Sequence, residues 1–356
     1  MTPEGGRPFG GQPAVLIAAD NPDPSQPAFV DATVLPGRGM MLLRARLQLP
    51  SGEIVDAIDA PAAEIAAERL SGGADDFAGN QSFAFGGAIL APYANRVRGK
   101  ALAEARLIST QVAGHDVRLP RNWGGRQPGA ATYAMHGLIL ATPAVWQQID
   151  RSCVRGRIAA GDFGVGWPGS CEIDIEWRLA ARALTLKVRA RNVGAETSPI
   201  GIGWHPYFTV TDRTQARLRL AAELRARVNN YDEVLPTGEL DPVAKGPFDF
   251  REASGRPLGD TYLDDCFTGM NALPTLAALN DPQRGCGLVL SSSSRAVRAL
   301  QVYAPPDANY VVLEPQFNLG DPFGDQWRGQ ETGMVPVEPG GSVEYEVTVT
   351  PTVLPQ

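Results

Sequence analysis

Alternation of apolar and polar side chains with a period of two recurs along most of this chain and restricts its fold more than any other feature. The pattern is clearest in Cys171–Leu179, where the odd positions are apolar, and it returns in Leu184–Ala190 and Val343–Val349. Successive side chains of a strand point to opposite faces, so this period is typical of strands that bury one face. The sequence shows no period of ~30 residues typical of strand–helix–strand units, which argues against a doubly wound parallel sheet.

The remaining segments fit the same picture. Residues 61–70 are the best helix candidate, with proline at the start, alanine and glutamate inside, and two glycines soon after. The 39 glycines and 30 prolines among 356 residues suit many strands joined by turns. We therefore predict an all-β protein, a large antiparallel β-sandwich with few short helices. Residues 1–27 are expected to form a flexible N-terminal arm, because Asp-Pro and other proline punctuation dominates there, and residues 28–356 a single β-sandwich domain.

Composition excludes several classes of partner. The net charge of −7 disfavours nucleic acid or an anionic membrane. No stretch approaches the ~20 apolar residues of a membrane span, and the N-terminal segment lacks the features of a secretory signal, so we expect a cytoplasmic protein. The four cysteines form no C-x-x-C pair and are expected to be reduced core residues rather than zinc ligands: Cys153, Cys171, Cys266 and Cys286.

No nucleophile-elbow, phosphate-loop or zinc-protease motif is present, so the candidate chemistry depends on three histidines and several carboxylates. His205 lies in the aromatic stretch Gly201–Phe208, after a Ser-Pro break. An imidazole titrates near neutral pH and can act as an acid or a base. The alternative is a core histidine that only satisfies a buried backbone group.

Carboxylates beside aromatic residues are the next candidates. Glu314 follows an apolar strand core and precedes a proline, and partial burial there would raise its pKa towards that of a general base. Asp264 and Asp265 lie within Tyr262–Phe267, where a carboxylate can accept hydrogen bonds from sugar hydroxyls. The alternatives are a solvated strand-end carboxylate for Glu314 and a polar turn for the aspartates.

Two further polar residues lie in glycine-rich loops. Arg96 follows Asn95 and can donate a fork of hydrogen bonds to sugar oxygens, or form a surface salt bridge instead. His136 precedes Gly137, a glycine expected to let a ligand approach closely, although a turn histidine is the alternative. His115 is expected at a surface hairpin tip.

The order of these motifs resembles that of the aldose 1-epimerase family, the galactose mutarotases, from about residue 30 to 350. His205–Phe208 matches the family's His-x-Tyr-Phe motif. Pro92–Val97 looks like its Pro-x-x-Asn-Arg-Ile/Val segment, and Gln301–Tyr303 is similar to the Gln-x-Tyr strand before the catalytic glutamate.

The resemblance implies a β-sandwich of the galactose mutarotase type as the catalytic domain, with Glu314 as general base and His205 as general acid. It implies that the chain interconverts the α and β anomers of a free hexose or related aldose. No cofactor or metal is implied, the partner is a small-molecule sugar, and the protein is expected to be a monomer or homodimer. The implied substrate-binding residues are Arg96, His136, Asp264 and, as a further candidate, Gln301.

Two departures from the family pattern bear on the preferred sugar. Leu138 stands where many members have a second glycine, and Gln316–Asp321 replaces the usual continuation after the glutamate. A non-catalytic carbohydrate-binding or sensing domain on the same fold is one alternative. A hexose-6-phosphate 1-epimerase is another, in which Arg96 and Arg98 would contribute to a phosphate site. A glycosidase using Asp264 and Glu314 is a weaker alternative.

Overall fold

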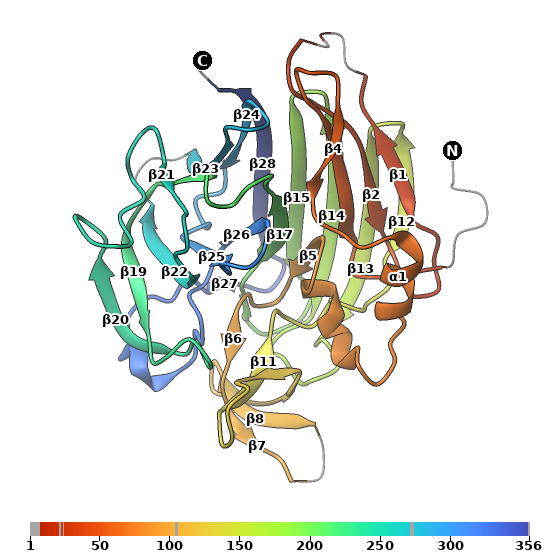
Figure 1. Ribbon diagram of the computed structural model, residues 1–356. Helices are drawn as coiled ribbons and strands as arrows, with labels where there is room; N and C mark the ends of the chain where they lie inside the picture. The colour runs from red at the N-terminus through yellow and green to blue at the C-terminus, as the bar shows by residue number, and fades with distance from the viewer. Residues whose placement is uncertain (1–7, 21–22, 24, 104–105, 271–273, 355–356) are drawn as a thin grey trace.

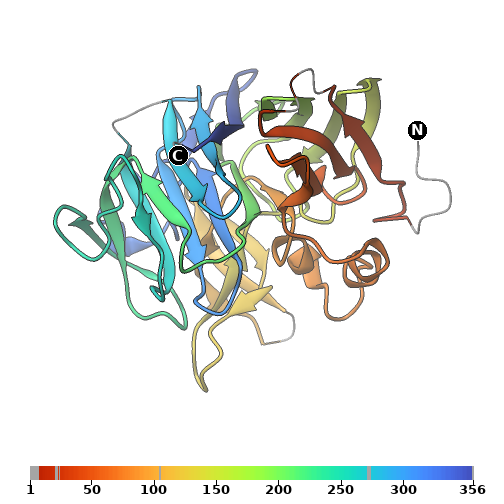
Figure 2. The ribbon, with the colours of Figure 1, turned by 45° about the horizontal axis from the view of Figure 1, so that its top comes forward.

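Two large antiparallel sheets make up most of the computed structural model, which describes residues 8–20, 23, 25–103, 106–270 and 274–354. Figure 1 shows the strands of both sheets running through the molecule, and Figure 2 shows the same arrangement tilted so that its top comes forward. The first sheet has eleven strands in the order β1-β2-β3-β4-β17-β26-β25-β22-β19-β20, with β5 paired to β17 and β3. Its strands are β1 (Val15–Ala18), β2 (Ala28–Leu35), β3 (Met41–Gln48), β4 (Ile54–Ile58), β5 (Gly87–Leu90), β17 (Gly203–Thr209), β19 (Ala222–Val228), β20 (Pro236–Pro242), β22 (Leu263–Met270), β25 (Ala299–Ala304) and β26 (Tyr310–Gln316).

The second sheet has nine strands in the order β12-β13-β14-β15-β28-β24-β23-β18-β21. They are β12 (Val145–Asp150), β13 (Cys153–Gly161), β14 (Cys171–Ala180), β15 (Ala183–Asn192), β18 (Arg217–Leu220), β21 (Arg256–Pro257), β23 (Thr275–Asp281), β24 (Cys286–Ser292) and β28 (Ser342–Val353).

Three small sheets complete the described strands. They are β10 (Trp123–Gly124), β11 (Thr132–Met135) and β6 (Arg96–Val97); β7 (Lys100–Ala101), β8 (Leu107–Val112) and β9 (His115–Pro120); and β16 (Ser198–Ile200) with β27 (Val335–Val337). The helices are short: α1 (Ala63–Arg69) and the 3-10 turns η1 (Phe77–Phe83) and η2 (Asp325–Trp327). None of these described helices is long and apolar enough to cross a membrane.

The period of two explains both large sheets. In β14 each apolar odd position is buried, while the intervening polar positions are partly or fully exposed. Strands β14 and β15 pair in register from Cys171 and Asn192 to Ala180 and Ala183 across a tight turn. One cluster of buried apolar side chains joins the sheets, and it includes Ile17 and Phe29 of the first sheet and Trp177 of the second. The prediction of an antiparallel β-sandwich with few short helices is confirmed.

One part of the predicted N-terminal arm is wrong. Val15–Ala18 forms strand β1, which pairs with β2, and Val15 and Ile17 are buried in the main core. Burial of these two side chains fixes a segment whose proline-rich flanks resemble a linker. Residues 1–7, 21, 22 and 24 of the predicted arm lie outside the described residues.

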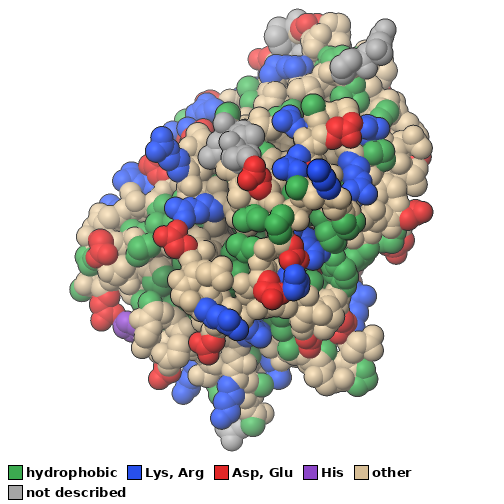
Figure 3. Space-filling model, turned by 90° about the vertical axis from the view of Figure 1, so that its left-hand side faces the viewer, with side chains coloured by type: hydrophobic (Ala, Val, Ile, Leu, Met, Phe, Trp, Pro, Cys, Tyr) green, Lys and Arg blue, Asp and Glu red, His purple; other side chains and the backbone are tan. Residues whose placement is uncertain are grey.

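The outer side of strands β19 and β20 carries charges of both signs. Arg227 on β19 pairs with Asp241 on β20 over 2.6 Å. Figure 3, which shows the molecule from this side, has basic and acidic side chains interspersed over the face.

All four cysteines are buried and free, as predicted.

Candidate active site

The centre of the eleven-stranded sheet brings together residues that are far apart in the sequence. Strands β17, β26, β25 and β22 are consecutive neighbours there. Gly203 pairs with Gln316 and Tyr207 with Val312, which places His205 opposite Glu314. Gln301 on β25 pairs directly with Glu314.

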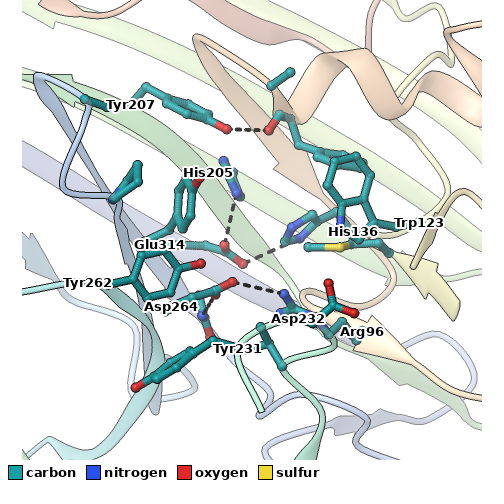
Figure 4. Close-up of a pocket in the computed structure, with 18 of the residues that line it drawn as sticks. Arg96, Trp123, His136, His205, Tyr207, Tyr231, Asp232, Tyr262, Asp264 and Glu314 are labelled. Atoms are coloured by element: carbon teal, nitrogen blue, oxygen red, sulfur yellow. Dashed lines mark hydrogen bonds and ion pairs between the residues drawn. The ribbon is translucent and has the colours of Figure 1, made fainter. Parts of the chain in front are cut away.

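Glu314 lies at the floor of a cavity and faces two histidines (Figure 4). Its carboxylate oxygens are 3.6 Å from Nε2 of His205 and 3.7 Å from Nδ1 of His136. The Glu314 side chain is fully buried, and neither oxygen accepts a hydrogen bond from a described residue. A buried carboxylate without partners is costly, which is typical of a group kept for chemistry or ligand binding.

Burial opposes charge on all three groups. It raises the pKa of Glu314 well above its usual range, an effect that Arg96 partly offsets and Asp264 reinforces. Burial also lowers the pKa of His205 to about 4. The pKa of His136 falls well below its usual value through burial, then through His205 and Arg96. Burial therefore favours the neutral form of each of the three groups.

His136 reaches this cluster from a loop after β11. Its backbone N–H donates to the carbonyl of Asn95 over 2.9 Å, and the Asn95 N–H donates to its Nδ1 over 3.3 Å. Both residues have a positive φ, 62° for His136 and 63° for Asn95, a conformation that these residue types tolerate better than most. The sequence thus supplies two compatible residues for a tight reciprocal contact.

A second cluster lies beside the first. The Arg96 guanidinium is 3.3 Å from Asp264, and Gln301 donates to the other Asp264 oxygen over 2.6 Å. Asn95 donates to Gln301 over 2.9 Å and accepts from Arg96 over 3.0 Å. This network fixes Asp264 and Arg96 on the cavity wall, where both keep hydrogen-bonding capacity for hydroxyl groups.

Aromatic rings form the sides of the cavity. His205 and Tyr207 are on the same face of β17, with ring centroids 5.2 Å apart, and the Tyr207 hydroxyl donates to the carbonyl of Phe83 over 2.8 Å. Phe83 contacts the His136 ring at 4.9 Å. Phe208, on the opposite face, packs in the main core. Tyr207 therefore lines the cavity beside His205, whereas Phe208 belongs to the core behind the strand.

The two histidines and Glu314 are also the only described group whose donor atoms approach a metal-binding arrangement, within 4.8 Å of one another. Ligands that share one zinc ion at ~2.0–2.2 Å lie closer together than this. In addition, Nδ1 of His136 already accepts the Asn95 N–H. The arrangement fits proton transfer better than metal binding.

The structure corrects two interpretations of the sequence. Gly137 does not make room for a ligand: a Cβ there would lie 2.4 Å from the carbonyl oxygen of Ala91, so glycine is required by backbone packing. Asp265 does not line the cavity with Asp264 but accepts from Arg225 over 2.8 Å and from the Tyr231 hydroxyl over 3.1 Å. Both residues therefore support the structure around the cavity and do not contact a ligand in it.

Two peripheral residues also have defined places. His115 is exposed at the start of β9, next to the turn that joins β8 and β9, as predicted. Arg98 donates to Asp321 over 2.6 Å and does not line the cavity, which removes it from a phosphate site there.

Sequence reasoning missed most of the aromatic lining. Phe83 belongs to an irregular 3-10 segment and Trp123 to a two-residue strand, and neither segment has a readable period. Tyr262 and Tyr303 could have been identified from the sequence. Each is two residues away from a candidate, Asp264 and Gln301 respectively, and therefore lies on the same strand face.

Comparison with known proteins places these features in a family. A model of the aldose 1-epimerase family matches residues 54–351. The uncharacterized protein YphB of Escherichia coli is 26% identical over 179 residues, a match that covers 49% of this chain and only 57% of that protein.

Solved structures share the fold. The GalM/aldose epimerase homologue from C. elegans has a TM-score of 0.71 at 16% identity, covering 96% of this chain and 100% of that one. A galactose mutarotase-like protein from Clostridium acetobutylicum has a TM-score of 0.70 at 15% identity, covering 92% and 93%. The family match spans most of the sequence and the sandwich architecture is common to these structures, so the chain belongs to the aldose 1-epimerase family.

Proposed function

We propose that this protein is an aldose 1-epimerase that interconverts the α and β anomers of a free aldose, with Glu314 and His205 transferring the protons. The observation that carries the proposal is the 3.6 Å separation of the Glu314 carboxylate and His205 Nε2 at the floor of a cavity of about 570 Å³. Epimerisation requires an acid and a base that act together on one hemiacetal, and this pair has that spacing.

The reaction opens and recloses the sugar ring. Glu314, as the carboxylate, takes the proton of the C1 hydroxyl while protonated His205 gives a proton to the ring oxygen, and the C1–O5 bond breaks. Rotation about C1–C2 then presents the other face of the aldehyde. In closure the two groups exchange roles: His205 removes the proton from the C5 hydroxyl as it attacks C1, and Glu314 protonates the new C1 hydroxyl.

The electrostatics of the pair support this sequence of steps. Ring opening leaves Glu314 protonated and His205 neutral. Burial favours that distribution, since it raises the pKa of Glu314 and lowers that of His205. The environment therefore stabilises the pair in the state that accompanies the open-chain aldehyde, the intermediate towards which the transition state of ring opening leads.

The remaining polar residues are assigned to substrate binding. Arg96, Asp264 and Gln301 form one hydrogen-bonded network on the wall and offer donors and acceptors to ring hydroxyls. Nε2 of His136 is buried without a partner among the described residues and is available as a further donor.

A phosphorylated substrate has less support. The charged residues that line the cavity are two arginines and four carboxylates, and Arg96 is already paired with Asp264. A phosphate favours converging arginines.

The test is polarimetry of freshly dissolved α-D-glucose, α-D-galactose and related aldoses, with and without the protein. We expect at least one sugar to reach its equilibrium rotation faster than the spontaneous reaction, at a rate proportional to protein concentration. Binding of aldoses in calorimetry without any acceleration would instead identify a non-catalytic sugar-binding protein.

A further inference from the structure

The cavity extends well beyond Glu314 and His205. Its volume is about 570 Å³, within the range of roughly 300–1,000 Å³ that accepts drug-sized ligands, whereas a single pyranose ring is much smaller than such a ligand. Among the exposed large hydrophobic side chains of the described chain, two are aromatic, Trp123 and Tyr231, at 41% and 43% exposure. Both line the outer part of this cavity, on opposite sides in Figure 4.

These outer rings are held in place. The Tyr231 hydroxyl lies 3.1 Å from both oxygens of Asp265, which is itself paired with Arg225. Trp123 packs edge-on against Phe83 at 5.4 Å. Rings that are already ordered lose little conformational entropy when a ligand stacks on them.

Aromatic contacts connect the outer part of the cavity with its floor. Tyr231 contacts Tyr262 at 5.2 Å, and the row continues through Tyr303 and Tyr310 to Tyr207 beside His205. The electron-rich faces of such rings favour the weakly positive C–H faces of pyranose rings. The row thus offers one continuous wall for more than one sugar ring.

Polar groups at the rim disfavour a purely apolar occupant. Arg126 lines the cavity and brings a charged guanidinium to it. Asp232 accepts two backbone N–H groups, from Arg126 and Gln127, and retains further acceptor sites. An apolar substituent would remove these groups from water without replacing their hydrogen bonds, whereas hydroxyl groups would satisfy them.

The chemistry of the reaction fixes how a larger substrate must lie. C1 and O5 of the reacting ring have to contact Glu314 and His205 at the floor, so the opposite edge of the ring, with C3 and C4, faces the opening, and C6 projects from C5 at the side. We propose that Trp123, Tyr231 and Tyr262 form a subsite for a second, uncharged sugar ring, joined through C4 or C6 to the ring that reacts. This inference rests on the proposed function. The substrates are then reducing disaccharides or the reducing ends of longer oligosaccharides.

The kinetic test compares maltose, linked through C4, and melibiose, linked through C6, with glucose in the same polarimetric assay. In Trp123→Ala we expect the ratio of kcat/KM for the better disaccharide to that for glucose to fall about tenfold. Val145→Ala removes an 83% exposed apolar side chain outside the cavity and serves as the matched control. An unchanged ratio in Trp123→Ala overturns the subsite while acceleration of glucose mutarotation still supports the proposed function.

A binding test examines the subsite independently of the epimerase activity. Calorimetry on Glu314→Gln measures the dissociation constants of maltose, melibiose and glucose without turnover. We expect tighter binding of at least one disaccharide than of glucose, and loss of that advantage in Glu314→Gln/Trp123→Ala. Equal or weaker disaccharide binding overturns the subsite. If no sugar is epimerised by the wild type, the proposed function fails and this measurement alone decides the subsite.

Discussion

The backbone N–H of Asn95 donates a hydrogen bond to Nδ1 of His136 over 3.3 Å. A ring nitrogen that accepts an N–H carries no proton, so in the neutral imidazole the proton is on Nε2. This contact gives the two buried histidines different roles. His136 is held in one tautomer as a donor, while His205 has Nε2 directed at Glu314 and is free to exchange a proton with it.

Replacement of His136 by alanine should therefore affect binding more than turnover. Loss of one hydrogen bond to an uncharged hydroxyl costs about 1 kcal/mol, so we expect KM to rise roughly fivefold with a smaller change in kcat. Polarimetric kinetics on the preferred aldose measure both constants. A collapse of kcat with KM unchanged would move His136 into the proton-transfer step.

Glu314→Gln should abolish most turnover while the sugar still binds. The amide keeps the size of the carboxyl group but cannot take a proton, and general acid–base catalysis contributes roughly 10²–10⁴-fold. We expect kcat to fall by a factor in that range, with the dissociation constant changed by less than about threefold. Glu64→Gln, an exposed change on α1, is the control.

His205→Asn should give a loss of similar size, and the double variant should lose little more than either single one. Groups that act as one unit are strongly non-additive in kinetics. Full activity in either single variant would contradict the assignment of the pair, and additive losses would mean that the two side chains act independently.

The sequence predicts the parts of this site that depend on local patterns, and not the parts that depend on which strands are neighbours in the sheet. The aromatic stretch of β17 shows no alternation of polar and apolar residues, so the sequence did not separate His205 and Tyr207, which line the cavity, from Trp204 and Phe208, which pack in the core. That β17 and β26 are neighbours depends on the order of strands in the sheet, and the alternation of residues along one strand does not reveal that order. The pairing of His205 with Glu314 was available only through the family resemblance.

Short or irregular segments escaped prediction for a related reason. Trp123 lies in a strand of two residues, too short to show any period. The four residues of β1 also lack a convincing pattern beside their proline-rich flanks, and only burial against the main core reveals them. In both cases tertiary packing, rather than local preference, determines the structure.

The pH dependence of activity should be shifted to the acid side of a typical histidine enzyme. The active pair holds one proton in total, so activity is lost at low pH when it binds a second one and at high pH when it releases the first. Burial lowers the pKa of His205 to about 4 and raises that of Glu314 well above its usual range. We expect kcat/KM to be constant around pH 6 and to fall only towards pH 4 on the acid side. An acid limb centred near pH 6.5 would contradict this distribution of the proton.

Arg96 and Asp264 should depend on each other for stability. The Arg96 side chain is 4% exposed and that of Asp264 14%, so removing one leaves the other charge buried and unpaired. We expect Arg96→Ala to cost about 3 kcal/mol of unfolding free energy. Arg96→Ala/Asp264→Ala should cost less than the sum of the two single changes, measured by urea denaturation as a double-mutant cycle. Strict additivity would mean that the pair does not interact.

His205 should also contribute a defined pH dependence to folding. Its pKa is about 4 in the folded state against 6.5 for the free side chain. Between these values the unfolded chain binds the proton and the folded one does not, so stability is present above pH 6.5 and is lost as the pH falls towards 4. From pH 7 to pH 5 the loss amounts to about 2 kcal/mol, because each pH unit of full difference is worth about 1.4 kcal/mol. Asparagine at this position does not titrate, so His205→Asn should lose about 2 kcal/mol less than the wild type over the same interval. Urea denaturation at both pH values measures the difference, and equal losses in the two proteins would show that His205 titrates alike in the folded and unfolded chains.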